Sequence, residues 1–262
     1  YSINLDKLMG RNSAGASVLT GYFSNGTPQN FWVYAKDKTN AQSFADLLSQ
    51  KGSRKDAKYI SWHKFFELNG PGNLFYPGPD FNKMAWQRRF VGENAWSICG
   101  ITHTTSSSKV MDAIGGYYVD PVKSWDALIC TSEAVKENVQ FILESKKKYL
   151  RDEMGLSQFI GPKLPVIPLG INTREFDFSK NDKLRARKIL NVDNNCVIIA
   201  YVGRLSFHAK ANPIAMYCAI EKAARLNPSK NIKILECGWF HNDWIQSAFS
   251  EMEKTILSKV EL

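Results

Sequence analysis

The sequence predicts an α/β fold in which parallel strands alternate with crossover helices. Short apolar runs recur along the chain, and the segments between them carry apolar residues at helical spacing. Hydrophobic residues make up 44% of the 262 residues, which is enough to bury a sizeable core and excludes a disordered chain. The length allows one large domain or two modest ones.

The first part of the chain is expected to contribute five strands, over residues 31–35, 58–62, 96–102, 127–130 and 164–167. A helix with Asn40 as its N-cap is expected after the first of them, and Gly52 is expected to end it. Thr131 or Ser132 can cap the helix that follows the fourth strand. The stretch 69–79 is rich in Gly and Pro and is interpreted as turns.

A break follows, because residues 168–182 have the composition of turns and linkers. The α/β pattern then restarts at residues 197–202, which are apolar at every position, as is typical of a strand covered on both faces. One helix through Met216 and Ile220, a strand at 232–235 and a last amphipathic helix complete the chain. The apolar face of that last helix is Ile245, Phe249, Met252, Ile256 and Val260.

We therefore expect two domains, residues 1–172 and residues 173–262. Two strands and two helices would leave the second domain with a thin sheet and an exposed edge, so we expect the natural protein to continue past Leu262. A chain that begins with Tyr1 is also expected to have lost native N-terminal residues.

The formal net charge of +9 does not indicate a nucleic-acid partner. There are 20 basic and 15 acidic residues up to Gly170, and 14 and 10 after it, so the excess is even and forms no basic tail. The only dense basic run, Lys146–Lys148, is interpreted as a solvated helix end. Peripheral contact with an anionic membrane surface is the alternative.

The five cysteines are an odd number without C-x-x-C spacing, so neither a disulfide framework nor a zinc site is predicted. Cys99, Cys130 and Cys196 lie in apolar runs and are expected to be small buried hydrophobes in a reducing compartment. The longest apolar stretch, 196–202, is too short for a membrane-spanning helix. The predicted location is the cytoplasm, with the inner face of the membrane as a peripheral alternative.

Four histidines follow predicted strands, where ligands bind in open α/β sheets: His63, His103, His208 and His241. Since no pair has close ligand spacing, no shared metal site is predicted. His103 lies in the hydroxyl-rich run 102–108, which suits the wall of a pocket for a ligand rich in hydroxyl groups, such as a sugar. Alternatively, Ser107 or Ser108 in this run simply caps a helix.

Two cations, Arg204 and Lys210, lie in the loop that follows the strand ending at Gly203. A guanidinium and an ammonium there can bind a diphosphate, although two solvated surface cations are the alternative. Small residues around Gly15 precede a short helical pattern, where backbone N–H groups can approach an anion.

Three segments, taken in order, resemble the retaining, GT-B-fold glycosyltransferases of the group-1 class (family 4). Residues 126–132 are similar to a strand of that class that ends in Ser. Residues 166–176 resemble its "IPNGVDTxxF" hinge, with Leu169 where Asn is usual. Residues 202–205 with Lys210 resemble its "VGRL…K" loop. The resemblance implies a Rossmann-like, acceptor-side domain followed by the truncated start of a Rossmann-like donor domain.

The resemblance also implies roles for individual residues. Arg204 and Lys210 would bind the diphosphate of a UDP- or GDP-linked sugar, and Gly15, in a loop between the domains, would approach the same phosphates. His103 would be the catalytic residue that contacts a donor-sugar hydroxyl. Neither a metal nor a cofactor is implied, because the two cations neutralise the leaving group.

The sequence departs from the class at two places. The spacing from Arg204 to Lys210 is one residue longer than usual. Glu253 and Glu261 have the spacing of the E-x7-E carboxylate pair of the class but lack its surroundings, so we expect the true pair beyond Leu262. The chain is therefore expected to be incomplete and inactive alone.

The predicted function is transfer of a hexose-type sugar, with retention, from a nucleotide-sugar donor to a saccharide or lipid-linked acceptor in cell-surface polysaccharide or glycoconjugate synthesis. No nucleic-acid partner is expected. A nucleotide-sugar epimerase on the same fold and a non-catalytic scaffold fragment are the alternatives.

Overall fold

The computed structural model describes residues 10–26, 30–50, 56–171, 173–208, 210 and 212–260, and within these ranges the fold is α/β with parallel sheets. The chain divides into two compact units, one ending at Ile171 and the other continuing from residue 172. Gly52 and residues 1–9, which carry part of the sequence predictions, lie outside the described residues.

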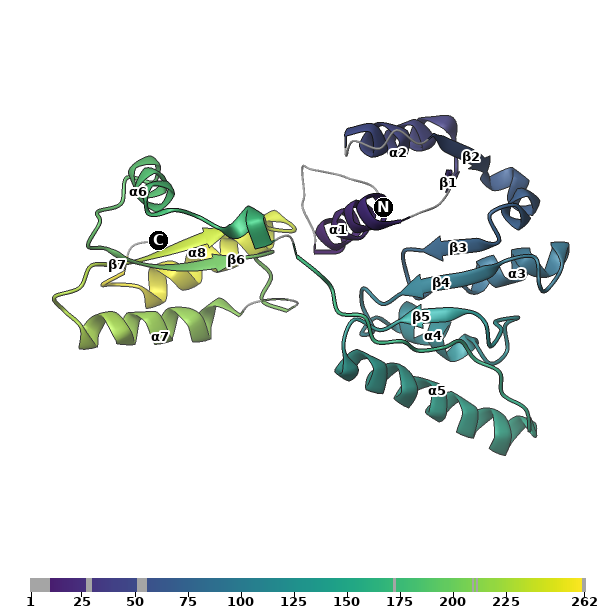
Figure 1. Ribbon diagram of the computed structural model, residues 1–262. Coiled ribbons are helices and arrows are strands. Elements are labelled where there is room, and N and C mark those ends of the chain that lie inside the picture. Colours follow the sequence, from purple (N-terminus) through teal and green to yellow (C-terminus); the bar gives the residue numbers. More distant parts are fainter. Residues whose placement is uncertain are drawn as a thin grey trace. The chain divides into compact units, whose positions relative to one another are not determined.

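Unit 1 alternates strands and helices in the order that Figure 1 shows. Its elements are α1 (Gly10–Asn25), β1 (Phe31–Ala35), α2 (Lys38–Gln50), β2 (Ala57–Ser61), the 3-10 segment η1 (Trp62–Asn69), β3 (Asn73–Tyr76), α3 (Asn82–Val91), β4 (Ser97–Ile101), α4 (Ser108–Gly116), β5 (Ala127–Ile129) and α5 (Glu133–Met154). β1 pairs with β2, and β3, β4 and β5 form a second parallel sheet in that order.

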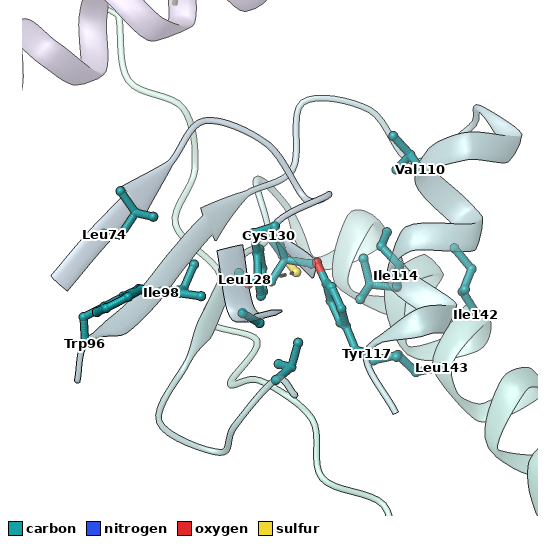
Figure 2. Packing of buried hydrophobic residues seen from close by; sticks show 14 of the residues in the cluster. Leu74, Trp96, Ile98, Val110, Ile114, Tyr117, Leu128, Cys130, Ile142 and Leu143 are labelled. Atoms are coloured by element: carbon teal, nitrogen blue, oxygen red, sulfur yellow. Dashed lines mark hydrogen bonds between the residues drawn. The ribbon is translucent and has the colours of Figure 1, made fainter. Parts of the chain in front are cut away.

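The main core of unit 1 joins the second sheet to α3, α4 and α5. Figure 2 shows side chains of the strands and of the last two helices meeting there: Ile98, Leu128, Cys130, Ile114, Ile142 and Leu143. Tyr117, directly after α4, is fully buried and stacks on Phe81 with ring centroids 4.8 Å apart. Burial of these apolar side chains supplies the main stabilising free energy of the unit.

The strands predicted at 31–35, 58–62, 96–102 and 127–130 are confirmed as β1, β2, β4 and β5, with ends shifted by one residue or less. The turn-rich stretch, predicted from residues 69–72 and 76–79, also contains a strand that was not predicted, because β3 lies at residues 73–76 and pairs with β4. The strand expected at 164–167 is wrong. Residues 163 and 166 form isolated bridges to β5, and Pro165 has no N–H with which to continue the ladder.

One of the predicted helix caps is wrong, and two are confirmed in position. α2 begins two residues before Asn40, whose N–H is accepted by Asp37 Oδ1 at 2.9 Å. Ser132 caps α5 and accepts the N–H of Val135 at 3.2 Å, as predicted. Ser107 is the N-cap residue of α4, but its hydroxyl makes no capping hydrogen bond.

Unit 2 is built around two parallel strands. Its elements are η2 (Thr173–Phe176), α6 (Lys180–Ile189), β6 (Val197–Val202), α7 (Pro213–Leu226), β7 (Ile232–Cys237) and α8 (Asp243–Ile256). β6 and β7 pair from Val197 with Ile232 to Val202 with Cys237. The core of the unit includes Tyr217, Ile220, Ile234, Ile245 and Phe249.

Two expectations for unit 2 are corrected by the structure. α6 begins inside the stretch interpreted as linker, because Ser179 and Asp182 form a capping box rather than a turn. β6 is not covered on both faces, since the side chains of Val197 and Val202 are 43% and 80% exposed. Among the described residues β6 pairs with β7 alone. The sheet is therefore smaller than the covered sheet that an all-apolar strand predicts.

Neither unit contains a helix, among the residues described, that could cross a membrane by its length and apolar character. The expected face of α8 is confirmed at Ile245 and Phe249, which are buried. Val260 is buried in the same unit, but it lies beyond the end of the helix at Ile256.

Candidate functional site

The first candidate site is the edge of the second sheet at which β3, β4 and β5 end. These strands are parallel, so the loops that follow them meet at one edge. Thr102, after β4, donates from its hydroxyl to Ile129 O at 3.1 Å, and its oxygen accepts the N–H of Thr131 at 3.2 Å. These hydrogen bonds fix the exit of β4 beside the exit of β5.

His103 follows Thr102 and is exposed at this edge. It lies beside Gly78 in the loop after β3, since a Cβ built on Gly78 would be 3.5 Å from His103 Cε1 and 2.7 Å from Asp80 Oδ1. The imidazole and the carboxylate therefore flank the same glycine. A side chain at residue 78 would fill the space between them, so glycine keeps this small polar site open.

Asp80 was not predicted from the sequence to be a site residue. A hydrogen bond anchors the loop that contains it. The hydroxyl of buried Tyr117 donates to the carbonyl oxygen of Pro79, one residue before it. Burial raises the pKa of both Tyr76 and Tyr117, and the charge of Asp80 raises it further. The signal available in the sequence was a carboxylate directly after Pro-Gly-Pro in a strand exit, which was interpreted as a turn.

Gly15 is not in a loop, which corrects the expectation for it. It is buried within α1 and is the sixth residue of the helix. Only the first four N–H groups of a helix lack an intrahelical acceptor, so the N–H of Gly15 has no free capacity for a phosphate. Gly15 therefore contributes only the absence of a side chain at its position on α1.

The second candidate site is the edge of the unit 2 sheet at which β6 and β7 end. Gly203 and Gly238 follow the two strands, and a Cβ built on Gly238 would be only 1.9 Å from Gly203 O. Pairing continues past the strands, because Leu205 donates its N–H to Trp239 O at 3.1 Å. The two exit loops therefore run in direct contact, and glycine at 238 is required for it.

Arg204 projects from this edge in a partly buried position. Its guanidinium carbon lies 6.0 Å from the centroid of the Trp239 ring, and its carbonyl oxygen accepts the hydroxyl of Tyr201 at 3.2 Å. Among the described residues, none forms an ion pair with this guanidinium. A guanidinium over an aromatic face keeps its donors available for an anion.

Lys210 lies in the turn between β6 and α7, six residues after Arg204. Its side chain is exposed, and its N–H donates to the carbonyl oxygen of Ser206 at 2.9 Å. Ser206 is buried, and its hydroxyl is 3.4 Å from His208 Nδ1. Both residues predicted as diphosphate ligands thus belong to one loop, between β6 and α7.

Glu236 is a further titratable residue near the end of β7. It accepts the hydroxyl of Tyr217 at 2.7 Å, and burial raises its pKa. Its side chain shares the strand face of Ile232 and Ile234, which pack in the core with Tyr217. It therefore belongs to the core contact with α7 rather than to the exit loop.

The structure distributes the four histidines over three sheets. His63 follows β2, His103 follows β4, and His208 and His241 belong to unit 2. In the part of the chain that the structure describes, no three His, Cys, Asp or Glu side chains are grouped so that they could bind a metal ion.

No family model matches the chain, and a search of curated proteins finds no match.

Proposed function

We propose that the chain is a nucleotide-sugar-dependent, retaining glycosyltransferase of the GT-B class. Unit 1 would serve the acceptor side, and unit 2 would bind the donor. The reaction would transfer a hexose-type sugar to a saccharide or lipid-linked acceptor in polysaccharide or glycoconjugate synthesis. The observation that carries the proposal is the loop after β6, which begins at the carboxyl end of a parallel strand pair and contains both Arg204 and Lys210.

A diphosphate fits the chemistry of that loop. The guanidinium of Arg204 offers a planar fork of donors and Lys210 a compact charge, and each charge-assisted hydrogen bond contributes about 1.5–3 kcal/mol. The aromatic ring of Trp239 beside Arg204 favours one orientation of the guanidinium. Two positive charges match the two phosphates of a nucleoside diphosphate.

The polar site in unit 1 fits a sugar or an acceptor hydroxyl. His103 and Asp80 flank Gly78, and a donor and an acceptor group side by side can hydrogen-bond neighbouring hydroxyl groups. In the proposed reaction the bond from the anomeric carbon to the diphosphate breaks, and an acceptor oxygen bonds on the same face. The residues contribute position and stabilise the charge of the departing diphosphate.

Isothermal titration of the full-length protein with UDP and with GDP tests this proposal. We expect binding of one of them, and Arg204→Ala should weaken it by about 10- to 100-fold, the equivalent of one charge-assisted hydrogen bond. Arg185→Ala is the matched control, because Arg185 is an exposed arginine of the same unit, paired with Asp182 on α6. Failure of both nucleotides to bind, or equal effects of the two substitutions, would contradict the proposal.

A further inference from the structure

The sheet formed by β1 and β2 has one face that unit 1 covers only in part. Phe31 packs with Leu48 of α2 and Phe23 of α1 on the covered face. Strand alternation places Trp32 and Tyr34 on the opposite face. The Trp32 side chain is 40% exposed there, so an aromatic side chain with high apolar area remains in solvent.

This face is continuous with η1 and α3. A Cβ built on Gly70, directly after η1, would lie 4.0 Å from the Trp32 ring. The rings of Tyr34 and Trp62 have centroids 6.3 Å apart, and the Tyr34 hydroxyl donates to Gln87 Oε1 at 3.3 Å. These contacts connect the open sheet face to one side of α3.

The connected elements expose further aromatic rings. Trp62 and Phe66 of η1 are 51% and 54% exposed, and Trp86 and Phe90 of α3 are 43% and 82% exposed. We call these four residues with Trp32 the aromatic surface. Single exposed apolar residues are ordinary, but a group of this kind on adjoining elements is typical of an interaction site.

The charges around the aromatic surface are predominantly positive. Four exposed cations lie on the same elements: Lys58, Lys64, Lys83 and Arg89. Two of them lie near exposed rings, with Lys58 Nζ 5.1 Å from the centroid of Trp32 and Arg89 Cζ 5.8 Å from that of Trp86. The carboxylate exposed on these elements, Glu67, is 3.6 Å from Lys64.

Asp120 is the other carboxylate that touches this surface. It accepts the indole N–H of Trp86 at 2.8 Å and an amide N–H of Asn82. These hydrogen bonds hold the Trp86 ring at the surface, and because both donors are neutral the carboxylate keeps its charge. The four cations still outnumber the two carboxylates, Glu67 and Asp120, so the aromatic surface has an excess of positive charge.

We propose that the aromatic surface docks unit 1 on a bilayer that contains anionic phospholipid. Tryptophan and tyrosine rings favour the headgroup level, apolar rings such as that of Phe90 enter the acyl boundary, and nearby cations are attracted by the negative leaflet. A saccharide chain fits less well, because it is recognised by hydrogen-bonding groups beside the rings rather than by excess positive charge. The proposal does not depend on the nucleotide site.

Vesicle co-sedimentation tests the proposal, with vesicles of phosphatidylcholine alone and with 30 mol% phosphatidylglycerol added. We expect binding to the anionic vesicles that weakens with added salt. Trp62→Ser with Phe90→Ser should reduce the partition coefficient at least about tenfold through lost apolar contact, and Lys83→Gln with Arg89→Gln should reduce it by about 10- to 30-fold.

Matched controls come from α5 of the same unit. Phe141→Ser removes a phenylalanine that is 71% exposed, and the triple change of Lys146, Lys147 and Lys148 to Gln removes the basic run. Both should leave vesicle binding within about twofold of the unchanged protein. Circular dichroism checks that all variants keep the same thermal midpoint, which is expected because the substituted side chains are exposed or, for Lys146 and Lys147, only partly buried.

Three results would overturn the proposal. These are no binding to anionic vesicles, binding that depends on Lys146–Lys148 but not on the aromatic surface, and binding of a soluble saccharide by this surface in place of vesicles. Arg204→Ala should leave vesicle binding unchanged, and the surface variants should leave nucleotide binding unchanged. Failure of the membrane proposal and failure of the proposed enzymatic function are therefore distinguishable.

Discussion

Arg88 and Asp126 form a fully buried ion pair that anchors the end of the second sheet. Their side chains are 1% and 0% exposed, and two hydrogen bonds of 2.6 and 2.8 Å join the guanidinium to the carboxylate. Asp126 also accepts the N–H of Ile98 at 2.9 Å and that of Lys123 at 2.8 Å. Two further N–H groups of the guanidinium donate to the carbonyl oxygens of Trp96 and Pro121.

Removing one partner of this pair should be strongly destabilising. Asp126→Ala leaves a buried guanidinium without its counter-charge, and we expect a loss of about 3–5 kcal/mol in the free energy of unfolding. Urea denaturation followed by fluorescence measures it. The control is Asp152→Ala, since Asp152 pairs with Arg151 at the surface and should cost under about 1 kcal/mol. Equal losses in the two variants would refute the structural role assigned to Asp126.

Glu221 of α7 holds the segment that follows α8. Its carboxylate accepts the N–H and hydroxyl of Ser258, at 3.0 and 2.6 Å, and the N–H of Lys259 at 3.0 Å. These hydrogen bonds, led by that of the Ser258 hydroxyl, lower the pKa of Glu221 to about 2. They keep Val260 in the core of unit 2.

The lowered pKa of Glu221 predicts a dependence of stability on pH. A carboxyl whose pKa is lower in the folded state stabilises the fold above its unfolded pKa, and the contribution is lost as pH falls. The contribution should be complete above pH 4.5 and disappear toward pH 2. Thermal unfolding between pH 7 and pH 3 should show a smaller acid destabilisation of unit 2 for Glu221→Gln. Identical pH profiles for the two proteins would contradict the assignment.

At the scale of elements, the long apolar runs predicted their own strands, whereas short or polar elements were missed. β3 has four residues between Gly72, whose φ is +68°, and Pro77, so the flanking turn residues concealed it. α6 buries no residue, so its sequence lacks the apolar periodicity that indicates a helix. Contacts with other elements, rather than the pattern of their own residues, determine that β3 and α6 form.

The contact between the exit loops of β6 and β7 gives a prediction at this scale. In Gly238→Ala the new methyl group would overlap Gly203 O, so the two loops must separate. The free energy of unfolding of unit 2 should fall by about 1–3 kcal/mol. Gly170→Ala is the control, because a Cβ there meets nothing within 4 Å. Denaturation midpoints of the two variants measure the difference. If Gly238→Ala is as stable as Gly170→Ala, the close approach of the loops is wrong.

At the scale of the whole molecule, each unit has its own hydrophobic core. The core of unit 1 includes fully buried Trp96 and Tyr117, and that of unit 2 includes Tyr217 and Ile234. A separate core is the property that lets a domain fold as a unit. The boundary at residues 171 and 172 lies one residue from the one expected between 172 and 173.

We therefore expect urea to unfold the chain in two transitions. Asp126→Ala should shift only the transition of unit 1, and Gly238→Ala only that of unit 2, because each substitution acts on one core. Tryptophan fluorescence and circular dichroism follow both transitions, because unit 1 contains buried Trp96 and unit 2 contains Trp239 and Trp244. A single transition that both substitutions shift equally would show that the cores are not independent.

The sequence by itself determined the α/β class, most strands and the helices with apolar faces, because these depend on local periodicity. It also brought out His103, Arg204 and Lys210, since polar residues after buried strands can be identified from order alone. Only the tertiary structure decided that Arg88 pairs with Asp126, that Asp80 stands beside His103, and that Gly15 is inside a helix. Contacts between residues far apart in the chain depend on how the elements pack, and the periodicity of apolar residues along the chain does not specify that packing.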